Sequence, residues 1–139
     1  MPNIIEMPPN VWGPFFWNTI HIITLAYPSD PDEQTKQAAK DFFYSLQYLL
    51  PCSICKEHYR NHLANYPPEI STKKDIIQYA FNLHNLVNKD LGKREISYQE
   101  FINHIQSLSN KSTINTSNIL YILLGSVAGI SLCYYFYKK

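Results

Sequence analysis

The chain has 139 residues, of which 45% are hydrophobic and 14% aromatic, and its formal net charge at pH 7 is +1. This length and composition predict one packed domain. The balanced charge argues against nucleic-acid binding, which needs a concentrated basic surface. The three cysteines, Cys52, Cys55 and Cys133, are too few and too unevenly spaced for the disulfide framework of a small secreted protein, and the N-terminal residues show no secretory signal.

Apolar and aromatic residues at helical spacing predict three helices in the first half of the chain. The first covers residues 11–27 and ends before Pro28. The second covers residues 31–50, since an acidic Asp-Pro-Asp-Glu segment suits a helix N-terminus. Pro51 cannot lie inside a helix, so a third helix covers residues 52–65. The apolar residues that recur at helical spacing in the second helix are Ala38, Phe42, Leu46 and Leu49.

Polar capping residues predict two more helices. Thr72, with an acidic residue three positions later, begins a helix over residues 72–91. Gly92 ends it, because glycine adopts the left-handed C-cap conformation most easily. Ser97, again with an acidic residue three positions later, begins a short helix over residues 97–108. No segment has the period of a strand, so the sequence predicts an all-α fold, a compact helical bundle.

The C-terminal end differs in kind from the rest. Residues 119–137 contain no charged side chain, and as a helix they would span about 28 Å, close to the hydrocarbon thickness of a bilayer. We expect a transmembrane anchor there; a buried core helix is the alternative. Residues 109–118 form a polar linker with glycosylation sequons at Asn110 and Asn115. The predicted domain is therefore residues 1–108.

The Cys52-Ser-Ile-Cys55 segment, with His58 and His62 after it, allows two chemistries. These four side chains are zinc ligands by type, but on one helix Cys55, His58 and His62 spread over about 10 Å, too far for all of them to bind one ion. Alternatively, Cys52 directly follows Pro51 at a helix start, where unpaired N–H groups favour a thiolate. Such a dithiol exchanges readily with other disulfides. We favour the redox interpretation with no metal, and the lack of strands argues against a thioredoxin fold.

Two other segments place polar and aromatic side chains on shared helix faces. Trp17 and His21 are four residues apart, and so lie on one face of the first helix. The residues that share a face of the fourth helix are His84, Val87, Asn88 and Leu91, with Asn85 three residues before Asn88. Buried amides and imidazoles need hydrogen-bond partners. A flat heteroaromatic ligand with several acceptors would supply them.

Taken in order, the segments WGPFFWNTIHIITLAYP, LPCSICKEHYRNHL and FNLHNLVNKDLGK resemble the Erv/ALR family of FAD-linked sulfhydryl oxidases over about residues 11–101. The resemblance implies a four-helix bundle with a short fifth helix that encloses FAD. Cys55 would face the flavin, and Cys52 would exchange with the substrate dithiol; both would be catalytic. Protein thiols and O₂ would give a disulfide and H₂O₂. The implied cofactor-binding residues are Gly13, Trp17, His21, Cys55, Phe81, His84, Asn85, Val87, Asn88, Leu91, Lys93 and Phe101.

The sequence departs from the family pattern at two places. Many members carry a second, shuttle CxxC pair, which this chain lacks; substrate dithiols would therefore reach Cys52 directly or through a thioredoxin-like relay protein. Several members also have a structural disulfide near the positions of Ala64 and Ser97, neither of which is cysteine here. The resemblance further implies a homodimer.

A small core with a terminal anchor is most similar to the membrane-anchored versions encoded by large DNA viruses. We therefore expect a single-pass protein of the host cytoplasm or virion membrane, with its catalytic domain in the cytosol. Two alternatives stay open: a membrane-tethered zinc- or flavin-binding adaptor without oxidase activity, and a redox relay that passes electrons to an acceptor other than O₂.

Overall fold

The computed structural model describes residues 7–112, and all regular secondary structure in this range is helical, which confirms the predicted all-α fold. The helices are α1 (Pro9–Ala26), α2 (Glu33–Leu49), α3 (Ser53–Asn65), α4 (Lys73–Asp90) and α5 (Tyr98–Ser112). The predicted anchor at residues 119–137 lies outside the described range. None of the helices within residues 7–112 is long and apolar enough to cross a membrane.

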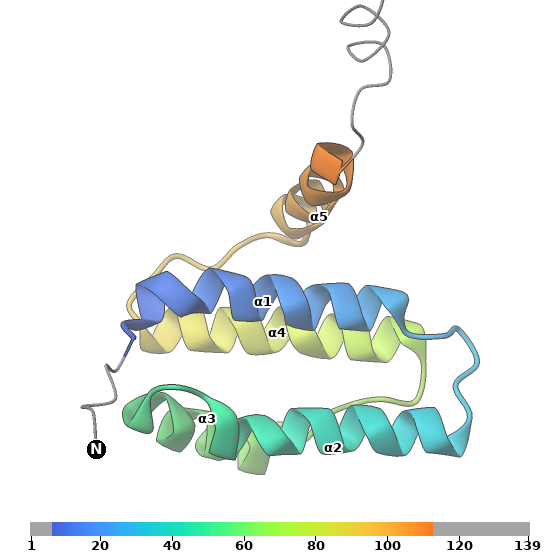
Figure 1. Ribbon diagram of the computed structural model, residues 1–139, viewed down its shortest axis with the longest axis horizontal. Helices are drawn as coiled ribbons and strands as arrows, with labels where there is room; N and C mark the ends of the chain where they lie inside the picture. The colour runs from blue at the N-terminus through green and yellow to red at the C-terminus, as the bar shows by residue number, and fades with distance from the viewer. Residues whose placement is uncertain (1–6, 113–139) are drawn as a thin grey trace, which may run out of the picture. The chain divides into compact units, whose positions relative to one another are not determined.

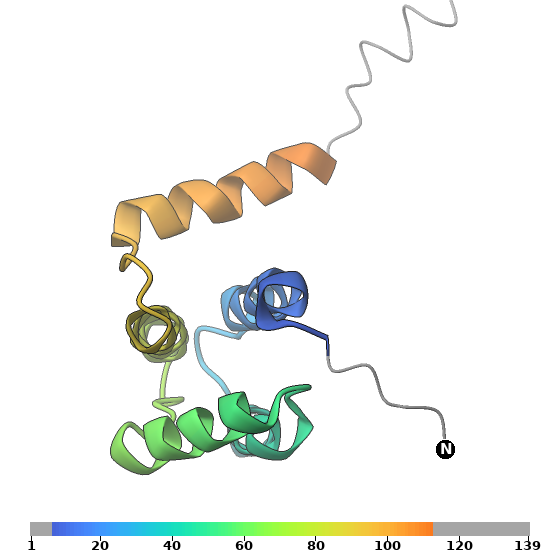
Figure 2. The same cartoon turned by 90° about the vertical axis from the view of Figure 1, so that its left-hand side faces the viewer.

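The first four helices belong to one compact unit that ends at Ile102. In this unit α1 packs against α4, α2 packs against α3, and α3 also contacts α4 (Figure 1). Figure 2 looks along α1 and α4 and shows them side by side in one layer, with α2 and α3 in a second layer. The four helices thus form the predicted bundle.

Local capping chemistry sets most of the helix ends. The Thr72 hydroxyl accepts a hydrogen bond from the Asp75 amide at 3.3 Å, so α4 begins where the sequence predicts. At its other end, Gly92 has a φ of +62°, and the amides of Gly92 and Lys93 donate to carbonyls of the last helical turn. This is a Schellman motif, which requires the left-handed conformation that glycine adopts without strain.

Two helices extend past their predicted bounds. α1 begins at Pro9 rather than at residue 11, because proline suits the first helical turn, where its missing N–H has no partner to lose. α5 continues to Ser112, past the predicted end at Leu108 and into the predicted linker.

The buried face of α2 differs from the predicted one. The residues that this helix and its C-cap bury are Ala39, Phe43, Leu46 and Leu50, whereas Ala38 and Leu49 are exposed and Phe42 is half-buried. Both sets have helical spacing and share Leu46, so the pattern of apolar residues fits two registers one residue apart. The prediction of the α2 core face was wrong by one residue for that reason.

The core of the bundle is one continuous cluster of buried apolar side chains from all four helices. Its members are Ile20, Tyr27, Ala39, Phe43, Leu46, Leu50, Tyr59, Leu63, Ile76, Tyr79, Ala80 and Leu83. Two buried hydroxyls fasten loops and helices to it: Tyr27 donates to the carbonyl of Ile70 at 3.1 Å, and Tyr59 donates to the carbonyl of Phe43 at 3.0 Å. Burial raises the pKa of Tyr59, which therefore stays a neutral donor.

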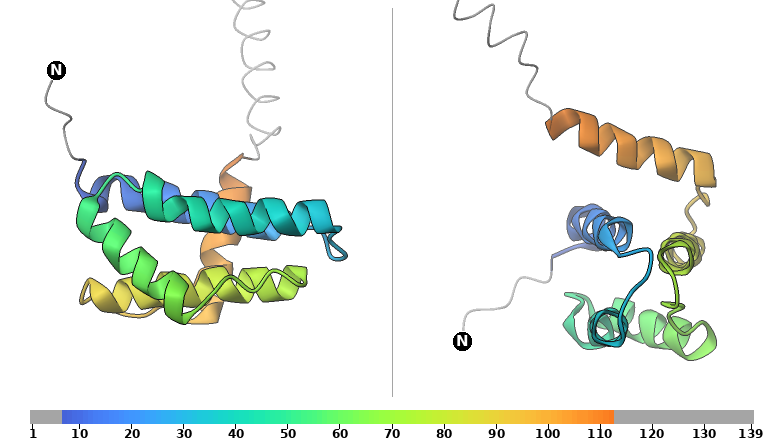
Figure 3. Two further views of the ribbon diagram at one scale, coloured as in Figure 1. Left: turned by 90° about the horizontal axis from the view of Figure 1, so that it is seen from below. Right: turned by 90° about the vertical axis from the view of Figure 1, so that its right-hand side faces the viewer.

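One end of the bundle brings three chain segments together. Figure 1 and Figure 3 show the turn from α2 to α3 at the same end as the start of α1 and the end of α4. The two cysteines of the CxxC segment lie on this turn and on the first turn of α3. The disulfide segment therefore lies at the end of the bundle where α1 begins and α4 ends.

Candidate functional site

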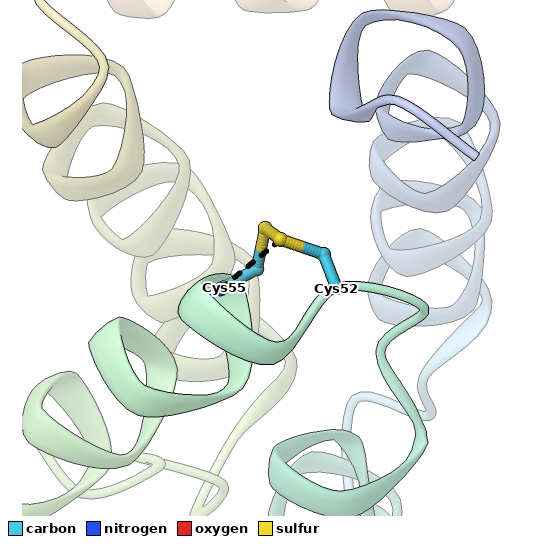
Figure 4. The surroundings of a disulfide bond; sticks show 2 residues. All are labelled: Cys52 and Cys55. Carbon is cyan, nitrogen blue, oxygen red and sulfur yellow. Dashed lines mark hydrogen bonds between the residues drawn. A yellow bond between two sulfur atoms is a disulfide. The ribbon is translucent and has the colours of Figure 1, made fainter. Parts of the chain in front are cut away.

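Cys52 and Cys55 form a disulfide bond at the start of α3. Pro51 ends the connection from α2, and Cys52 is the N-cap residue in an extended conformation. The Cys55 amide donates to the Cys52 sulfur at 3.2 Å, so this sulfur occupies the place of a capping oxygen. Figure 4 shows both sulfur atoms directed away from α3, on the side of α1 and α4. The predicted position of the redox pair at a helix N-terminus is confirmed.

The two sulfurs have different surroundings. Both cysteines are half-buried, but Cys55 packs against the hydrophobic core, whereas Cys52 lies on the connecting turn outside the helix. Ser53 and Ile54, between them, are exposed. A reagent from solvent can therefore approach Cys52 without displacing core side chains.

Three aromatic rings from α1 and α4 stack on one another. The rings of Trp17 and His84 are nearly parallel, with centroids 4.1 Å apart and an interplanar angle of 9°. His21, fully buried on α1, has its Nε2 atom 3.0 Å from Nδ1 of His84. One of these two nitrogens must donate and the other accept, so the pair shares a single proton at this contact. The predicted pairing of Trp17 and His21 on one helix face is thus present, and His84 joins them.

A second group of rings continues from His21. Phe101 is only 1% exposed, and its ring lies 4.7 Å from that of His21 and 5.6 Å from that of Phe81. Tyr98, which the sequence analysis did not single out, contacts both Phe81 and Phe101. The sequence could have indicated Tyr98, because it lies three residues before Phe101 and so on the same helix face. The structure therefore joins five of the predicted residues, Trp17, His21, Phe81, His84 and Phe101, in one ring cluster and adds Tyr98.

The side chain of Asn85 bonds to the backbone of the chain. Its side-chain Nδ2 donates to the Ile96 carbonyl at 2.9 Å, and its Oδ1 accepts from the Ile96 amide at 2.9 Å. These two bonds connect α4 to the segment between Gly92 and α5. In the same segment Arg94 makes two hydrogen bonds to the carboxylate of Glu100, at 2.8 and 3.1 Å.

The remaining predicted residues of α4 and its C-cap lie along its last two turns. Asn88 is buried, and its carbonyl accepts the Lys93 amide at 2.8 Å. Val87 is half-buried, whereas Leu91 and Lys93 are exposed. The structure thus brings Asn88 into the bundle, leaves Val87 half-buried, and places Leu91 and Lys93 at the surface.

Two features of α1 fit a flat ligand with hydrogen-bond acceptors. A Cβ atom built on Gly13 meets no other atom within 4 Å, so nothing in the protein fills the space that this glycine leaves. The adjacent Trp12 has a buried Nε1 atom with no hydrogen-bond partner. A buried donor of this kind is costly unless another molecule accepts from it. The residues present therefore fit a bound heteroaromatic group at this end of α1.

The histidines after the cysteines have other partners. His62 Nε2 lies 2.7 Å from Asp90 Oδ2, an ion pair or hydrogen bond between α3 and α4. His58 is exposed. Across residues 7–112, no three His, Cys, Asp or Glu side chains come together in a way that could hold a metal ion.

The arrangement as a whole has the parts of a thiol–disulfide exchange site. A helix N-terminus favours the thiolate that forms when the disulfide is broken, and the Cys55 amide is already directed at Cys52. The aromatic stack and the space beside Gly13 lie in the same bundle. The site can therefore exchange its disulfide with an external dithiol.

Comparisons with known proteins agree with this description. The model of the Erv1/Alr family matches residues 14–107. A probable FAD-linked sulfhydryl oxidase of Acanthamoeba polyphaga mimivirus is 34% identical over 96% of this chain and 97% of its own length. A FAD-linked sulfhydryl oxidase of African swine fever virus is 33% identical over 71% of this chain and 84% of its own. The crystal structure of the yeast Erv1 core superimposes with a TM-score of 0.61 at 25% identity, over 70% of this chain and 87% of that one. This chain belongs to the Erv1/Alr family.

Proposed function

We propose that the protein is a FAD-dependent thiol oxidase that makes disulfide bonds in proteins. Two thiols and O₂ give one disulfide and H₂O₂. The observation that carries the proposal is the Cys52–Cys55 disulfide at the start of α3, in the same four-helix unit as the Trp17–His84 stack. The names of the viral relatives support it.

The cofactor would be held by side chains from α1, α4 and the first turn of α5. Trp12 and Gly13 offer a buried donor and free space, and Trp17, His21 and His84 offer a stack of flat rings. Phe101 and Phe81 close the cluster, and Lys93 supplies a cation for a phosphate group. Val87, Asn88 and Leu91 would complete the site. When bound, FAD supplies a two-electron acceptor that reacts with O₂.

The cysteines carry out the exchange in two displacements. A substrate thiolate attacks the Cys52 sulfur, the Cys52–Cys55 bond breaks, and Cys55 leaves as a thiolate. A second substrate thiolate then attacks the substrate sulfur bound to Cys52, and Cys52 leaves with the electron pair. The substrate dithiol is oxidised by two electrons to a disulfide, and the enzyme disulfide is reduced by two electrons to a dithiol. Cys52 is the point of attack because it lies outside the helix, whereas Cys55 packs against the core.

The test compares the wild-type protein with Cys52→Ser and Cys55→Ser. Each protein is purified, its visible spectrum is recorded, and its oxygen uptake with dithiothreitol is measured. We expect bound oxidised flavin in all three proteins and oxygen uptake in the wild type alone. A colourless protein that binds zinc through these cysteines would favour the adaptor instead. A flavoprotein that reduces cytochrome c without oxygen uptake would favour the relay.

The protein is further proposed to act as a homodimer through α1. Val11, Phe15 and Ile22 lie on one face of this helix and are exposed, and a row of exposed apolar side chains is typical of a surface that another chain covers. Sedimentation of the wild type and of Phe15→Glu tests this, since a charge at the centre of the face should give a monomer. A Phe15→Glu protein that still sediments as a dimer would contradict it.

We also propose that residues 119–137 anchor the protein in a membrane, with the catalytic domain in the cytosol. The support is the uncharged run of sequence, as long as a bilayer core is thick. Protease protection of microsomes that contain the protein tests the orientation. Glycosylation at Asn110 or Asn115, seen as an endoglycosidase-sensitive shift in mobility, would overturn it.

A further inference from the structure

Large apolar side chains close to the disulfide in sequence face the solvent. Leu49 is 68% exposed, Ile54 is 67% exposed and Tyr48 is 65% exposed. Among the large hydrophobic residues that the structure describes, only Phe15 has a higher value, 71%. Three of the four most exposed apolar side chains therefore fall within seven consecutive residues that also contain Cys52.

The register of α2 explains why these side chains are outside. Leu46 and Leu50 are buried in the core, which turns Tyr48 to the opposite side of the helix and Leu49 to its flank. Ile54 lies between the two bonded cysteines, in the first turn of α3. The three side chains thus belong to the end of α2 and the start of α3, on both sides of the turn that carries Cys52.

The same stretch of chain has no charge. Between Asp41 and Lys56 every residue is uncharged, so this stretch of chain offers apolar groups, hydroxyls and an amide. A charged segment placed there would lose hydration without gaining an ion-pair partner. An uncharged apolar segment would release water from both surfaces. The lack of charge in this stretch therefore favours an uncharged polypeptide segment as the binding partner.

We propose that Tyr48, Leu49 and Ile54 form a docking surface for a polypeptide segment that carries uncharged, apolar residues beside its reactive cysteine. This inference rests on the proposed thiol oxidase function, because the substrate thiol must contact Cys52, and Leu49 and Ile54 are three and two residues from Cys52 in the chain. Folded proteins bury such segments, so the preferred substrates are chains whose cysteines are not yet packed. The exchange that follows is the pair of displacements at Cys52 and Cys55 described above.

The test uses the full-length, flavin-loaded enzyme and three thiol substrates. Two are synthetic peptides with the same pair of cysteines, one with leucine and tyrosine beside them and the other with serine and glutamate; the third is dithiothreitol. The variants are Tyr48→Ser, Leu49→Ser and Ile54→Ser. Tyr66→Ser is the matched control, because Tyr66 is also a largely exposed tyrosine (55%) but lies at the other end of α3.

We expect kcat/KM of the wild type to be about tenfold or more higher for the apolar peptide than for the charged one. Each of the three variants should lose most of that preference through a higher KM. Their turnover of dithiothreitol, which is too small to cover the surface, should change by less than about twofold. Since the surface is uncharged, kcat/KM for the apolar peptide should change little between about 50 mM and about 500 mM salt.

Three results would overturn the docking surface: equal rates for the two peptides, an equal loss in Tyr66→Ser, or a parallel loss of dithiothreitol turnover in the variants. A wild-type enzyme with no oxygen uptake would refute the proposed function instead. In that case the docking surface is still tested in Cys55→Ser, by the rate at which Cys52 displaces a chromophoric thiol from each activated peptide. That rate needs no flavin, and it should show the same preference.

Discussion

Asn85 provides the clearest test of how the structure holds the segment between α4 and α5. Both hydrogen-bonding atoms of its side chain bind the backbone of Ile96, at 2.9 Å each, in a half-buried position. In Asn85→Ala the Ile96 amide and carbonyl lose these partners. Two neutral hydrogen bonds contribute about 2 kcal/mol to the free energy of unfolding. The substitution also removes an amide from a helix interior, which alone would stabilise by about 0.5 kcal/mol.

The matched control is Asn82→Ala, three residues earlier on α4. Asn82 is exposed, and its side chain accepts a hydrogen bond from Gln78 within the helix at 2.9 Å. It gains the same helix propensity as Asn85→Ala but loses an exposed contact that contributes only about 0.3 kcal/mol. The difference between the two variants therefore isolates the bonds to Ile96, at about 2 kcal/mol.

The assay is urea unfolding followed by tryptophan fluorescence, together with hydrogen exchange at the Ile96 amide. The net loss in Asn85→Ala is about 1.5 kcal/mol. With an m-value of about 1 to 2 kcal/mol per molar urea, this should shift the midpoint down by about 0.8 to 1.5 M, and Asn82→Ala should hardly move it. The Ile96 amide should lose its protection in Asn85→Ala alone. Equal midpoints for the two variants, with Ile96 still protected, would refute the assigned role of Asn85. Loss of FAD affinity without loss of stability would identify Asn85 as a direct cofactor ligand.

Three other substitutions or conditions test separate parts of the structure. Gly13→Ala should raise the free energy of unfolding of the cofactor-free protein by up to about 1 kcal/mol, since no atom opposes the added Cβ. The same substitution should weaken FAD binding in a fluorescence titration. An unchanged affinity for FAD would show that the cofactor does not use this space. Tyr59→Phe removes the hydrogen bond to the Phe43 carbonyl and should lower the unfolding free energy by about 1 kcal/mol, whereas Tyr66→Phe, at the surface, should leave the urea midpoint in place. Hydrogen bonds from Arg94 and Ser97 lower the pKa of Glu100 to about 2. The contribution of this carboxylate to the free energy of unfolding should therefore be complete above its ordinary pKa of about 4.5 and be lost as the pH falls toward 2. An NMR titration that finds the pKa of Glu100 at its ordinary value would contradict this.

The helix ends at Thr72, Gly92 and Ser97 could be predicted because their chemistry is local. Thr72 and Ser97 each meet an amide three residues later, and Gly92 adopts the one backbone conformation that a Schellman motif needs. All the atoms involved lie within a few residues of one another, so the order of residue types is sufficient information. The same holds for Cys52, which caps α3 because Pro51 precedes it.

The role of Asn85 could not be predicted in this way. Its partner, Ile96, is eleven residues away and lies in an irregular segment, and both bonds are to backbone atoms. A residue type gives no indication of a contact that depends only on the path of a loop. The sequence placed Asn85 correctly on α4 near His84, but the direction of its amide is a property of the folded chain.

The register of α2 connects the one error in the predicted core with the proposed docking surface. Two faces of this helix, one with Leu49 and one with Leu50, are equally apolar and differ by a single residue. Had the chain buried Leu49, Leu50 would lie at the surface, and the approach to Cys52 would have another shape. The packing of Phe43 and Leu50 into the core fixes the register of α2 and leaves Leu49 exposed to solvent. The side chain that hydrophobic periodicity assigned to the core is therefore the one that a substrate would meet beside the disulfide.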